Sequence, residues 1–300
     1  SMIMLRIIAD STCDISKEDA RKMGIQIVPI SVRFGDEEFL DGVEITHEEF
    51  YTRLAECDEL PKTSQPSPDT FMKVFNEAVA AGDDVLGIFI SSDLSGTYQS
   101  ACLAALDVEE ETRKKLYMVD SRSASIGTAL LIREAVKLRD AGVNVSDIAA
   151  ACTEMSKYIK LTAVVGSLKY LKMGGRLSGA AAFAGTMLHI TPVVSIEDGK
   201  VVVIGKTRGK KAAEKLMHDK LIKDGLSLTR DFMFGHINCS ESLETFINKS
   251  LTYISDVNGN VGVSSIGCSV GTHVGPGTYG IAYVEAAESG MNRESIVKTA

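Results

Sequence analysis

The chain of 300 residues is short of positive charge, because 32 Lys and Arg residues face 40 Asp and Glu residues and the formal net charge is −8. A protein that binds nucleic acid or an anionic membrane surface through its overall charge needs the opposite balance. Long apolar runs are also absent, since none reaches the roughly 20 residues that cross a bilayer. Hydrophobic residues still form 45% of the chain. We therefore expect a globular protein with a full core, no integral membrane segment and no nucleic-acid partner.

Residue patterns that build disulfides or metal sites are missing as well. The six cysteines are scattered and form no C-x-x-C pair, which is typical of reduced thiols in the cytoplasm. The five histidines never fall at zinc-ligand spacing, and HINC at residues 236–239 is a single H-x-x-C pair. We therefore predict no metal site. The start, SMIMLRIIADS, has neither a basic region nor a cleavage site, so we expect a cytoplasmic protein without a signal peptide.

Segments that favour strands alternate with segments that favour helices over the first half of the chain. Thr46 and Glu49 form a capping box, and Ser67 followed by Pro68 is a second helix start. A third helix is predicted over residues 126–139, which are amphipathic. The expected strands cover residues 5–9, 25–34, 84–90 and 115–121. This alternation predicts a parallel sheet with helices on both faces.

The second half has a different pattern. Residues 191–206 form two strand-like runs joined through Asp198 and Gly199, which is a strong hairpin signal. Further strands are expected at residues 230–237, 261–266 and 279–284, with helices at 210–223 and from Ser240. We therefore predict an α/β protein of two domains: residues 1–160 with a parallel sheet in an α/β/α arrangement, and residues 161–300 with a mixed sheet.

Three short motifs match patterns of known sites but lack the context that those sites need. GCSVG at residues 267–271 puts Ser269 in a nucleophile elbow, yet the following THVGPG predicts no helix, and the elbow requires one. GPGTYG at 275–280 leads into a strand, whereas the dinucleotide fingerprint opens a helix. GKT at 205–207 lacks the earlier glycine of a P-loop. These motifs therefore predict neither a hydrolase nor a nucleotide-binding protein.

Hydroxyl side chains gather in ISSDLSGTYQSA, residues 90–101, where a buried strand gives way to a helix. Ligands bind at the carboxyl ends of parallel strands, and a helix that begins near Ser95 or Gly96 would offer backbone N–H groups to an anion. The loops KTSQPSP (62–68) and VDSRSASIG (119–127) have the same character. Helix capping alone also explains such residues. Three such loops on one sheet favour an anion site, and their scarcity of basic residues favours a single carboxylate over a phosphate.

The chain resembles the DegV family of bacterial fatty-acid-binding proteins in motifs that follow one another along nearly its whole length. These motifs are ADSTCDI (9–15), KTSQPS (62–67), ISSDLSGTYQSA (90–101), VDSRSASIG (119–127), LKYLKMGGRLSG (168–179), ITPVVSIEDGKV (190–201) and GTHVGPGTYGIAY (271–283). The resemblance implies a DegV-like fold, in which an N-terminal α/β/α domain supplies a carboxylate site and a C-terminal mixed-sheet domain helps enclose an acyl chain.

The function that the resemblance implies is lipid binding rather than catalysis, without a cofactor. Such a protein carries a long-chain fatty acid such as palmitate, stearate or oleate. It presents the carboxylate to a separate ATP-dependent fatty acid kinase, which makes acyl phosphate for phospholipid synthesis. The resemblance assigns the carboxylate contacts to Thr63, Ser95, Gly96 and His273. It assigns the head-group region or the kinase interaction to Arg176 and Arg208.

The energetics agree with a buried tail. A chain of about 16 carbons gains on the order of 10 kcal/mol from burial at about 0.8 kcal/mol per methylene, before ordering costs. The small-residue segment 178–190 would either wall the tunnel or pack closely. Two other functions stay open: a serine esterase or acyltransferase that uses Ser95 and His273, and a binder of a phosphorylated triose, against which the scarcity of basic residues in the loops argues.

Overall fold

The computed structural model describes residues 3–174, 177–178, 189–227, 229–254 and 261–289. The chain divides into two compact units, Ser1–Lys157 (unit 1) and Tyr158–Ala300 (unit 2). The sequence predicted a division between residues 160 and 161. Across the described residues, no helix combines the length and the apolar character that crossing a lipid bilayer requires.

Unit 1 is built on a four-stranded sheet in which every pairing is parallel, as the alternating pattern predicted. Its order is β2-β1-β6-β7, with β1 at Leu5–Asp10, β2 at Ile25–Val28, β6 at Asp84–Phe89 and β7 at Tyr117–Asp120. The central strand β6 is buried from Val85 to Phe89, because helices cover both faces of the sheet. All four strands end at the same edge, where the loops after β1, β6 and β7 lead toward helices.

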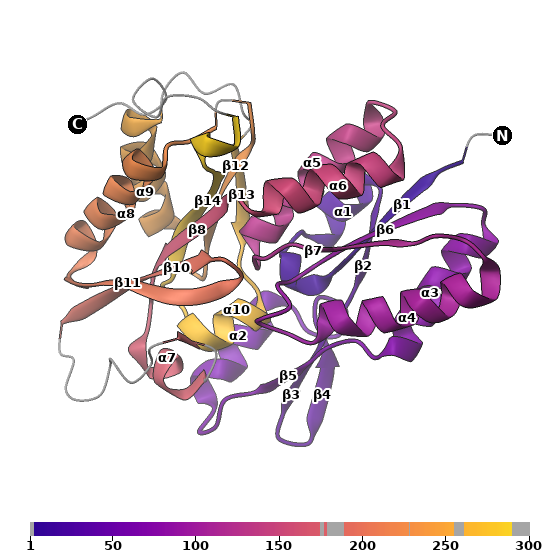
Figure 1. Ribbon diagram of the computed structural model, residues 1–300. Helices are drawn as coiled ribbons and strands as arrows, with labels where there is room; N and C mark the ends of the chain where they lie inside the picture. Colours follow the sequence, from indigo (N-terminus) through magenta and orange to yellow (C-terminus); the bar gives the residue numbers. More distant parts are fainter. Residues whose placement is uncertain (1–2, 175–176, 179–188, 228, 255–260, 290–300) are drawn as a thin grey trace. The chain divides into compact units, whose positions relative to one another are not determined.

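Helices lie on both faces of this sheet (Figure 1). They are α1 at Lys17–Met23, α3 at Pro68–Ala80, α4 at Thr97–Thr112, α5 at Ile126–Asp140 and α6 at Val145–Ser156. On one face, α3 and α4 pack against β1 and β6 around Phe71, Phe75 and Phe89, all fully buried. The ring of Phe71 contacts those of Phe75 and Phe89, with centroids 5.7 and 5.2 Å away. On the other face lie α5 and α6.

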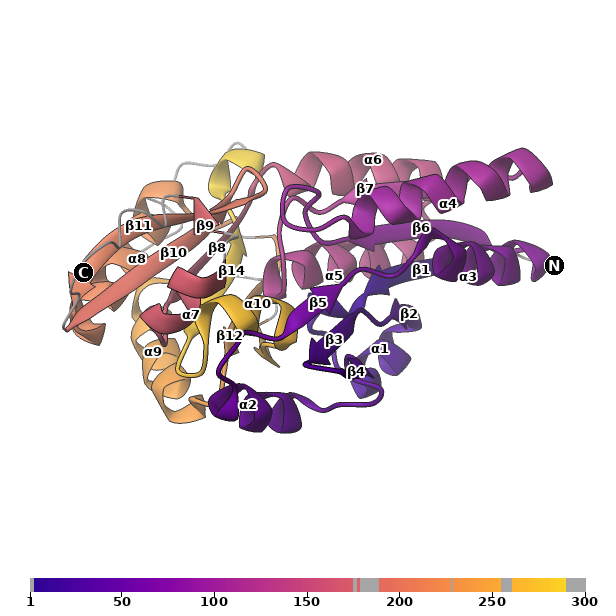
Figure 2. The same ribbon diagram turned by 90° about the horizontal axis from the view of Figure 1, so that it is seen from below.

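A second, smaller sheet interrupts the alternation in unit 1 (Figure 2). It is antiparallel, with order β4-β3-β5: β3 at Ser31–Phe34, β4 at Glu37–Leu40 and β5 at Lys62–Ser64. The single strand predicted over residues 25–34 is therefore wrong. Pro29 lacks the N–H that would continue the ladder, and Ile30 donates its N–H to Ser11 Oγ at 3.0 Å. The helix α2, His47–Glu56, follows with the predicted capping box of Thr46 and Glu49.

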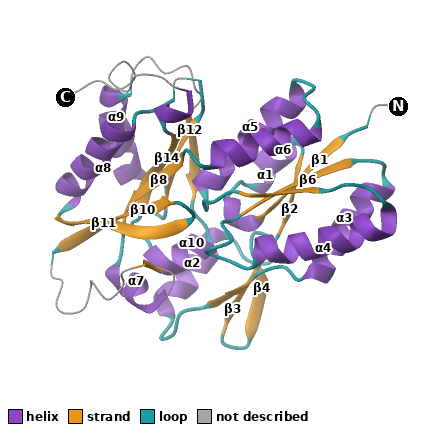
Figure 3. Cartoon of the chain, viewed as in Figure 1, coloured by secondary structure: helices purple, strands orange, loops and turns teal. Residues whose placement is uncertain are grey.

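The described residues of unit 2 form one mixed sheet of seven strands, which confirms the predicted fold class (Figure 3). The order is β13-β12-β14-β8-β10-β11-β9, and only the β12–β13 and β11–β9 pairs are parallel. The strands are β8 at Ile159–Val164, β9 at Leu177–Ser178, β10 at Ile190–Glu197, β11 at Lys200–Arg208, β12 at Phe232–His236, β13 at Val261–Ser265 and β14 at Tyr279–Val284. The hairpin of β10 and β11 turns at Asp198 and Gly199, as predicted.

The helices α8 (Lys210–Asp224) and α9 (Ser240–Tyr253) lie together against this sheet. Two tyrosine hydroxyls of β14 fix α8 to the sheet: Tyr279 donates to Glu214 Oε1 at 2.9 Å and Tyr283 donates to Asp224 Oδ2 at 2.6 Å. All four side chains are buried. Because each acid is hydrogen-bonded, its burial does not leave an unpaired charge in the core.

The remaining helices of unit 2, α7 (Leu168–Gly174) and α10 (Cys268–Val274), pack against each other. The sequence predicted no helix after GCSVG, and this is wrong, because α10 continues through Thr272 and His273 before Gly275 ends it at a φ of 73°. Ser269 is still no elbow serine, since it lies inside the helix.

Candidate functional site

Ser95 lies in the loop that joins β6 to α4, at the carboxyl edge of the parallel sheet of unit 1. The helix begins at Thr97 after Gly96, close to the predicted start. The hydroxyl of Ser95 is half-buried, accepts the N–H of Thr97 at 3.2 Å and lies 2.9 Å from Thr97 Oγ1. Ser95 therefore assists the start of α4, and its hydroxyl can also face a ligand.

The strand that precedes Ser95 is extended by hydrogen bonds from three consecutive N–H groups. Ile90 N donates to Asp10 Oδ2 at 3.1 Å, Ser91 N to Ser123 O at 2.8 Å, and Ser92 N to Asp120 Oδ1 at 3.3 Å. The acceptors come from the ends of β1 and β7 and from the loop after β7. The Ser95 loop is thus held from both neighbouring strands.

Thr63 lies in β5, opposite Val32 of β3. The prediction that its loop belongs to the same sheet as the Ser95 loop is wrong, because β5 pairs antiparallel with β3 in the smaller sheet. The structure nevertheless links the two loops. Ser100 Oγ of α4 donates to Pro66 O at 2.6 Å. Gln65 packs so closely on Gly96 that an added Cβ there would lie 2.7 Å from Gln65 Nε2.

The helix-cap interpretation holds for another hydroxyl of the Thr63 loop. Ser67 caps α3 by accepting the N–H of Thr70 at 3.1 Å, and Pro68 occupies the first helical turn. Thr63 itself lies on a strand and caps no helix. Helix capping therefore explains Ser67 of this loop but does not explain Thr63.

The motif ADSTCDI contains acids that organise this edge of the sheet, a role that the sequence analysis did not foresee. Asp10 is fully buried, and its carboxylate accepts hydrogen bonds from Thr12 N at 2.9 Å, from the Thr12 hydroxyl and from Ile90 N. Burial raises the pKa of Asp10, and the hydrogen bonds that its carboxylate accepts offset only part of this rise. Asp14 accepts from Ser125 Oγ at 2.5 Å. The signal was an acid at the end of an apolar strand, with a second acid four residues later.

Ser125 has the backbone conformation of a strained strand-to-helix turn, with φ 51° and ψ −127°. It follows β7, precedes α5 and stands in the pattern S-x-S-x-G at residues 123–127, which is close to the nucleophile-elbow motif. The Ser125 side chain is buried, however, and its hydroxyl points to Asp14. A hydroxyl in this position cannot attack a substrate as an exposed elbow serine does. Together with Ser125 N, which donates to Thr12 O at 3.0 Å, it fixes the start of α5.

The remaining predicted site residues lie in unit 2. His273 is half-buried near the end of α10, and Arg208 is exposed at the end of β11. The grouping of His273 with Thr63, Ser95 and Gly96 stays a prediction. Arg176 and residues 179–188 of the small-residue segment lie outside the described residues.

A groove of about 570 Å³ lies within unit 2, a volume in the range of small-molecule sites. Its lining combines apolar residues (Val164, Val165, Ile190 and Pro192) with polar and charged ones (Ser167, Lys169, Thr191 and Lys210). Close backbone packing shapes one wall: Gly166 approaches Pro276 so tightly that an added Cβ would lie 2.1 Å from Pro276 O. In the described part of the chain, no group of three or more His, Cys, Asp and Glu side chains is arranged to hold a metal ion.

The family model described as "Uncharacterised protein, DegV family" matches residues 4–286. A DegV domain-containing protein of Clostridium perfringens is 35% identical over 293 residues, which cover 95% of this chain and 99% of the relative. A fatty-acid-binding DegV family protein from Thermus thermophilus has a TM-score of 0.83 at 31% identity, covering 94% of this chain and all of that one. A stearic acid-binding protein from Eubacterium ventriosum also has a TM-score of 0.83, at 30% identity over 95% and 100% of the two chains. The chain therefore belongs to the DegV family.

Proposed function

We propose that the protein binds a long-chain fatty acid and holds its carboxylate with Thr63 and Ser95, beside Gly96 and His273. The observation that carries this proposal is the link between the two hydroxyl-bearing loops through Ser100 Oγ and Pro66 O. Two donors from different sheets are thereby kept at one end of unit 1. The fatty-acid-binding relatives among the solved structures support the same ligand class.

The charge around the Ser95 loop supports a ligand with one negative charge. Arg122 is the cation of this loop cluster, and its Nη1 lies 3.3 Å from Asp93 Oδ2 and 4.0 Å from Asp120 Oδ2. Its charge is therefore already balanced by two acids. Hydroxyl and backbone donors can orient a carboxylate without a net positive charge, whereas a dianionic phosphate is better served by free Arg or Lys.

The affinity in this proposal comes from the acyl chain. Burying about 16 carbons contributes on the order of 10 kcal/mol, while one hydrogen bond to a charged carboxylate contributes about 1.5–3 kcal/mol. We propose that the mixed-sheet unit 2 helps to enclose the acyl chain. The carboxylate contacts then select acids over neutral lipids.

The lipid itself provides the first test. Protein purified from a bacterial host, denatured and extracted, is expected to release about one long-chain fatty acid per chain in mass spectrometry. Ser95→Ala and Thr63→Ala should each weaken binding of oleate about tenfold, the loss expected from one such hydrogen bond. Ser64→Ala, at the exposed neighbour of Thr63, is the matched control and should bind normally. Repeated recovery of no lipid, or normal binding by both site variants, would contradict the proposal.

We further propose that the bound carboxylate is presented to a separate ATP-dependent fatty acid kinase in the cytoplasm, which forms acyl phosphate for phospholipid synthesis. In this role the chain is an accessory subunit rather than an enzyme, and exposed Arg208, together with Arg176, contacts the head-group region or the kinase. Arg208→Ala should lower acyl-phosphate formation in a mixture with the kinase and ATP while lipid occupancy stays unchanged. Equal phosphorylation of lipid on the variant and the parent protein would remove Arg208 from the proposal.

A further inference from the structure

Asp120 lies where the parallel pairing of β6 and β7 ends, opposite Phe89. One oxygen of its carboxylate, Oδ1, accepts two N–H groups from two different loops. Ser92 N donates from the Ser95 loop at 3.3 Å, and Arg122 N donates from the loop after β7 at 3.0 Å. The side chain is only 18% exposed. This single oxygen therefore joins the two loops at the edge of the sheet.

The connection from Asp120 to Ser95 is short. Ser92 follows Ser91, and Ser91 O accepts the N–H groups of Leu94 at 3.0 Å and of Ser95 at 3.2 Å. Ser91 N in turn donates to Ser123 O, in the loop that Asp120 also holds. Fixing Ser92 thus fixes the turn from which Ser95 projects.

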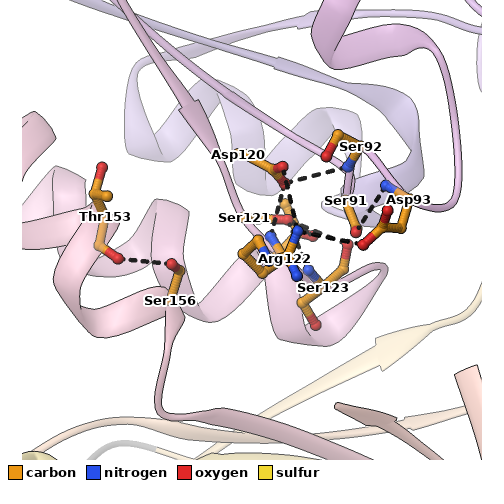
Figure 4. A network of polar contacts seen from close by, with 10 residues as sticks. Ser91, Ser92, Asp93, Asp120, Ser121, Arg122, Ser123, Thr153 and Ser156 are labelled. Atoms are coloured by element: carbon orange, nitrogen blue, oxygen red, sulfur yellow. Dashed lines mark hydrogen bonds and ion pairs between the residues drawn. The ribbon is translucent and has the colours of Figure 1, made fainter. Parts of the chain in front are cut away.

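Arg122 makes the second connection between the same loops. Its backbone has a φ of 57°, a conformation that costs energy for a residue other than glycine. Its N–H bond to Asp120 Oδ1 holds this conformation, and its Nη1 donates to Asp93 Oδ2 at 3.3 Å (Figure 4). Residues in such a conformation often cluster at functional sites, where hydrogen bonds hold them.

We propose that Asp120 is a positioning residue for the fatty-acid carboxylate site: it sets the Ser95 hydroxyl in place through Ser92 and Arg122. This inference rests on the proposed function. Asp120 acts chiefly as a hydrogen-bond acceptor, because both N–H bonds go to Oδ1, whereas its Oδ2 lies 4.0 Å from Arg122 Nη1, farther than the 3.3 Å of Asp93 Oδ2. An asparagine can supply the same acceptor oxygen.

The test uses the full-length protein after removal of bound lipid, with oleate titrated by calorimetry. Asp120→Ala should weaken oleate binding about tenfold, equivalent to about 1.4 kcal/mol. Asp120→Asn should bind within about twofold of the parent protein, which distinguishes an acceptor from a charge. Asp107→Ala removes an exposed acid from α4 and is the matched control. Thermal unfolding of each variant reports whether the fold is retained.

A double variant tests whether Asp120 affects oleate binding by positioning Ser95. Because Asp120 acts through Ser95, adding Asp120→Ala to Ser95→Ala should weaken binding far less than tenfold further. Full additivity, normal binding by Asp120→Ala, or equal losses in Asp120→Asn and Asp120→Ala would each overturn the inference. If Asp120→Ala does not fold, Arg122→Ala replaces it, and normal oleate binding by that variant overturns the inference. A parent protein that binds no oleate contradicts the proposed function instead.

Discussion

Gly166 and Gly96 provide a matched pair of alanine substitutions with opposite expected outcomes. A Cβ at Gly166 would lie 2.1 Å from Pro276 O, and 2.7 Å from both Pro276 C and Thr278 N, all of them main-chain atoms. A Cβ at Gly96 would also meet an atom at 2.7 Å, but that atom is Nε2, at the free end of the Gln65 side chain. Neither glycine has a positive φ, so contact rather than backbone strain decides both results.

The difference in magnitude follows from what has to move. In Gly166→Ala the backbone must separate, at a cost of about 1–3 kcal/mol for overpacking. The shift also weakens the bond from Gly166 N to Thr278 Oγ1 at 2.9 Å and that from Ser167 N to Val274 O at 3.1 Å, at a cost of up to about 1 kcal/mol each. We expect a loss of about 3 kcal/mol in the free energy of unfolding. In Gly96→Ala, Gln65 rotates away, and alanine lowers the entropy of the unfolded chain, so the net change stays within about 1 kcal/mol.

Thermal and urea unfolding of the full-length variants measure this difference. At about 2–4 °C per kcal/mol for a domain of this size, Gly166→Ala should lower Tm by roughly 10 °C, while Gly96→Ala leaves Tm nearly unchanged. Gly96→Ala should instead weaken oleate binding, because Gln65 is displaced between the two loops of the carboxylate site. Equal Tm values for the two variants would refute the close packing of Gly166 on Pro276.

Two further predictions concern the buried polar groups of unit 2. Removing the hydroxyl in Tyr283→Phe breaks the 2.6 Å bond to Asp224 and should cost about 2 kcal/mol in urea unfolding; an unchanged midpoint would contradict this bond. His218 stacks on Phe246 and Tyr253, and burial lowers its pKa below the ordinary 6.5. Because the unfolded chain then binds the proton more readily than the folded chain, the contribution of neutral His218 to stability is fully present above pH 6.5. It falls as the pH drops toward the lowered pKa of the folded chain. His218→Phe should therefore lose less stability than the parent protein between about pH 7.5 and about pH 5.5; identical losses would exclude His218 as a cause.

The sequence correctly predicted those elements that depend only on residues close together in the chain. The capping box of Thr46 and Glu49 starts α2, and the pair Asp198 and Gly199 turns the hairpin of unit 2. Alternating strand and helix patterns likewise predicted the parallel sheet. Each depends on residues a few positions apart, so propensity, capping and turn chemistry suffice.

Where local patterns misled, a neighbour in the chain or a distant contact was responsible. The run at residues 25–34 has strand composition throughout, yet Pro29 breaks it and β3 pairs with β4 and β5 instead. The THV of residues 272–274 contains β-branched residues before glycines, yet it completes α10, which packs against α7. Tertiary packing outweighs weak helix propensity in such short segments.

By itself, the amino-acid order was enough to identify the α/β class, the DegV family and Thr63 and Ser95 as candidate ligands of a carboxylate. It could not reveal that Thr63 lies on a different sheet, or that Asp10 and Asp120 hold the backbone before Ser95 from 80 and 28 residues away. Such bonds leave no periodic or local mark, because the partners meet only once the strands are ordered in the sheet. The folded chain alone determines which carboxylates accept those N–H groups, and hence how the site is held.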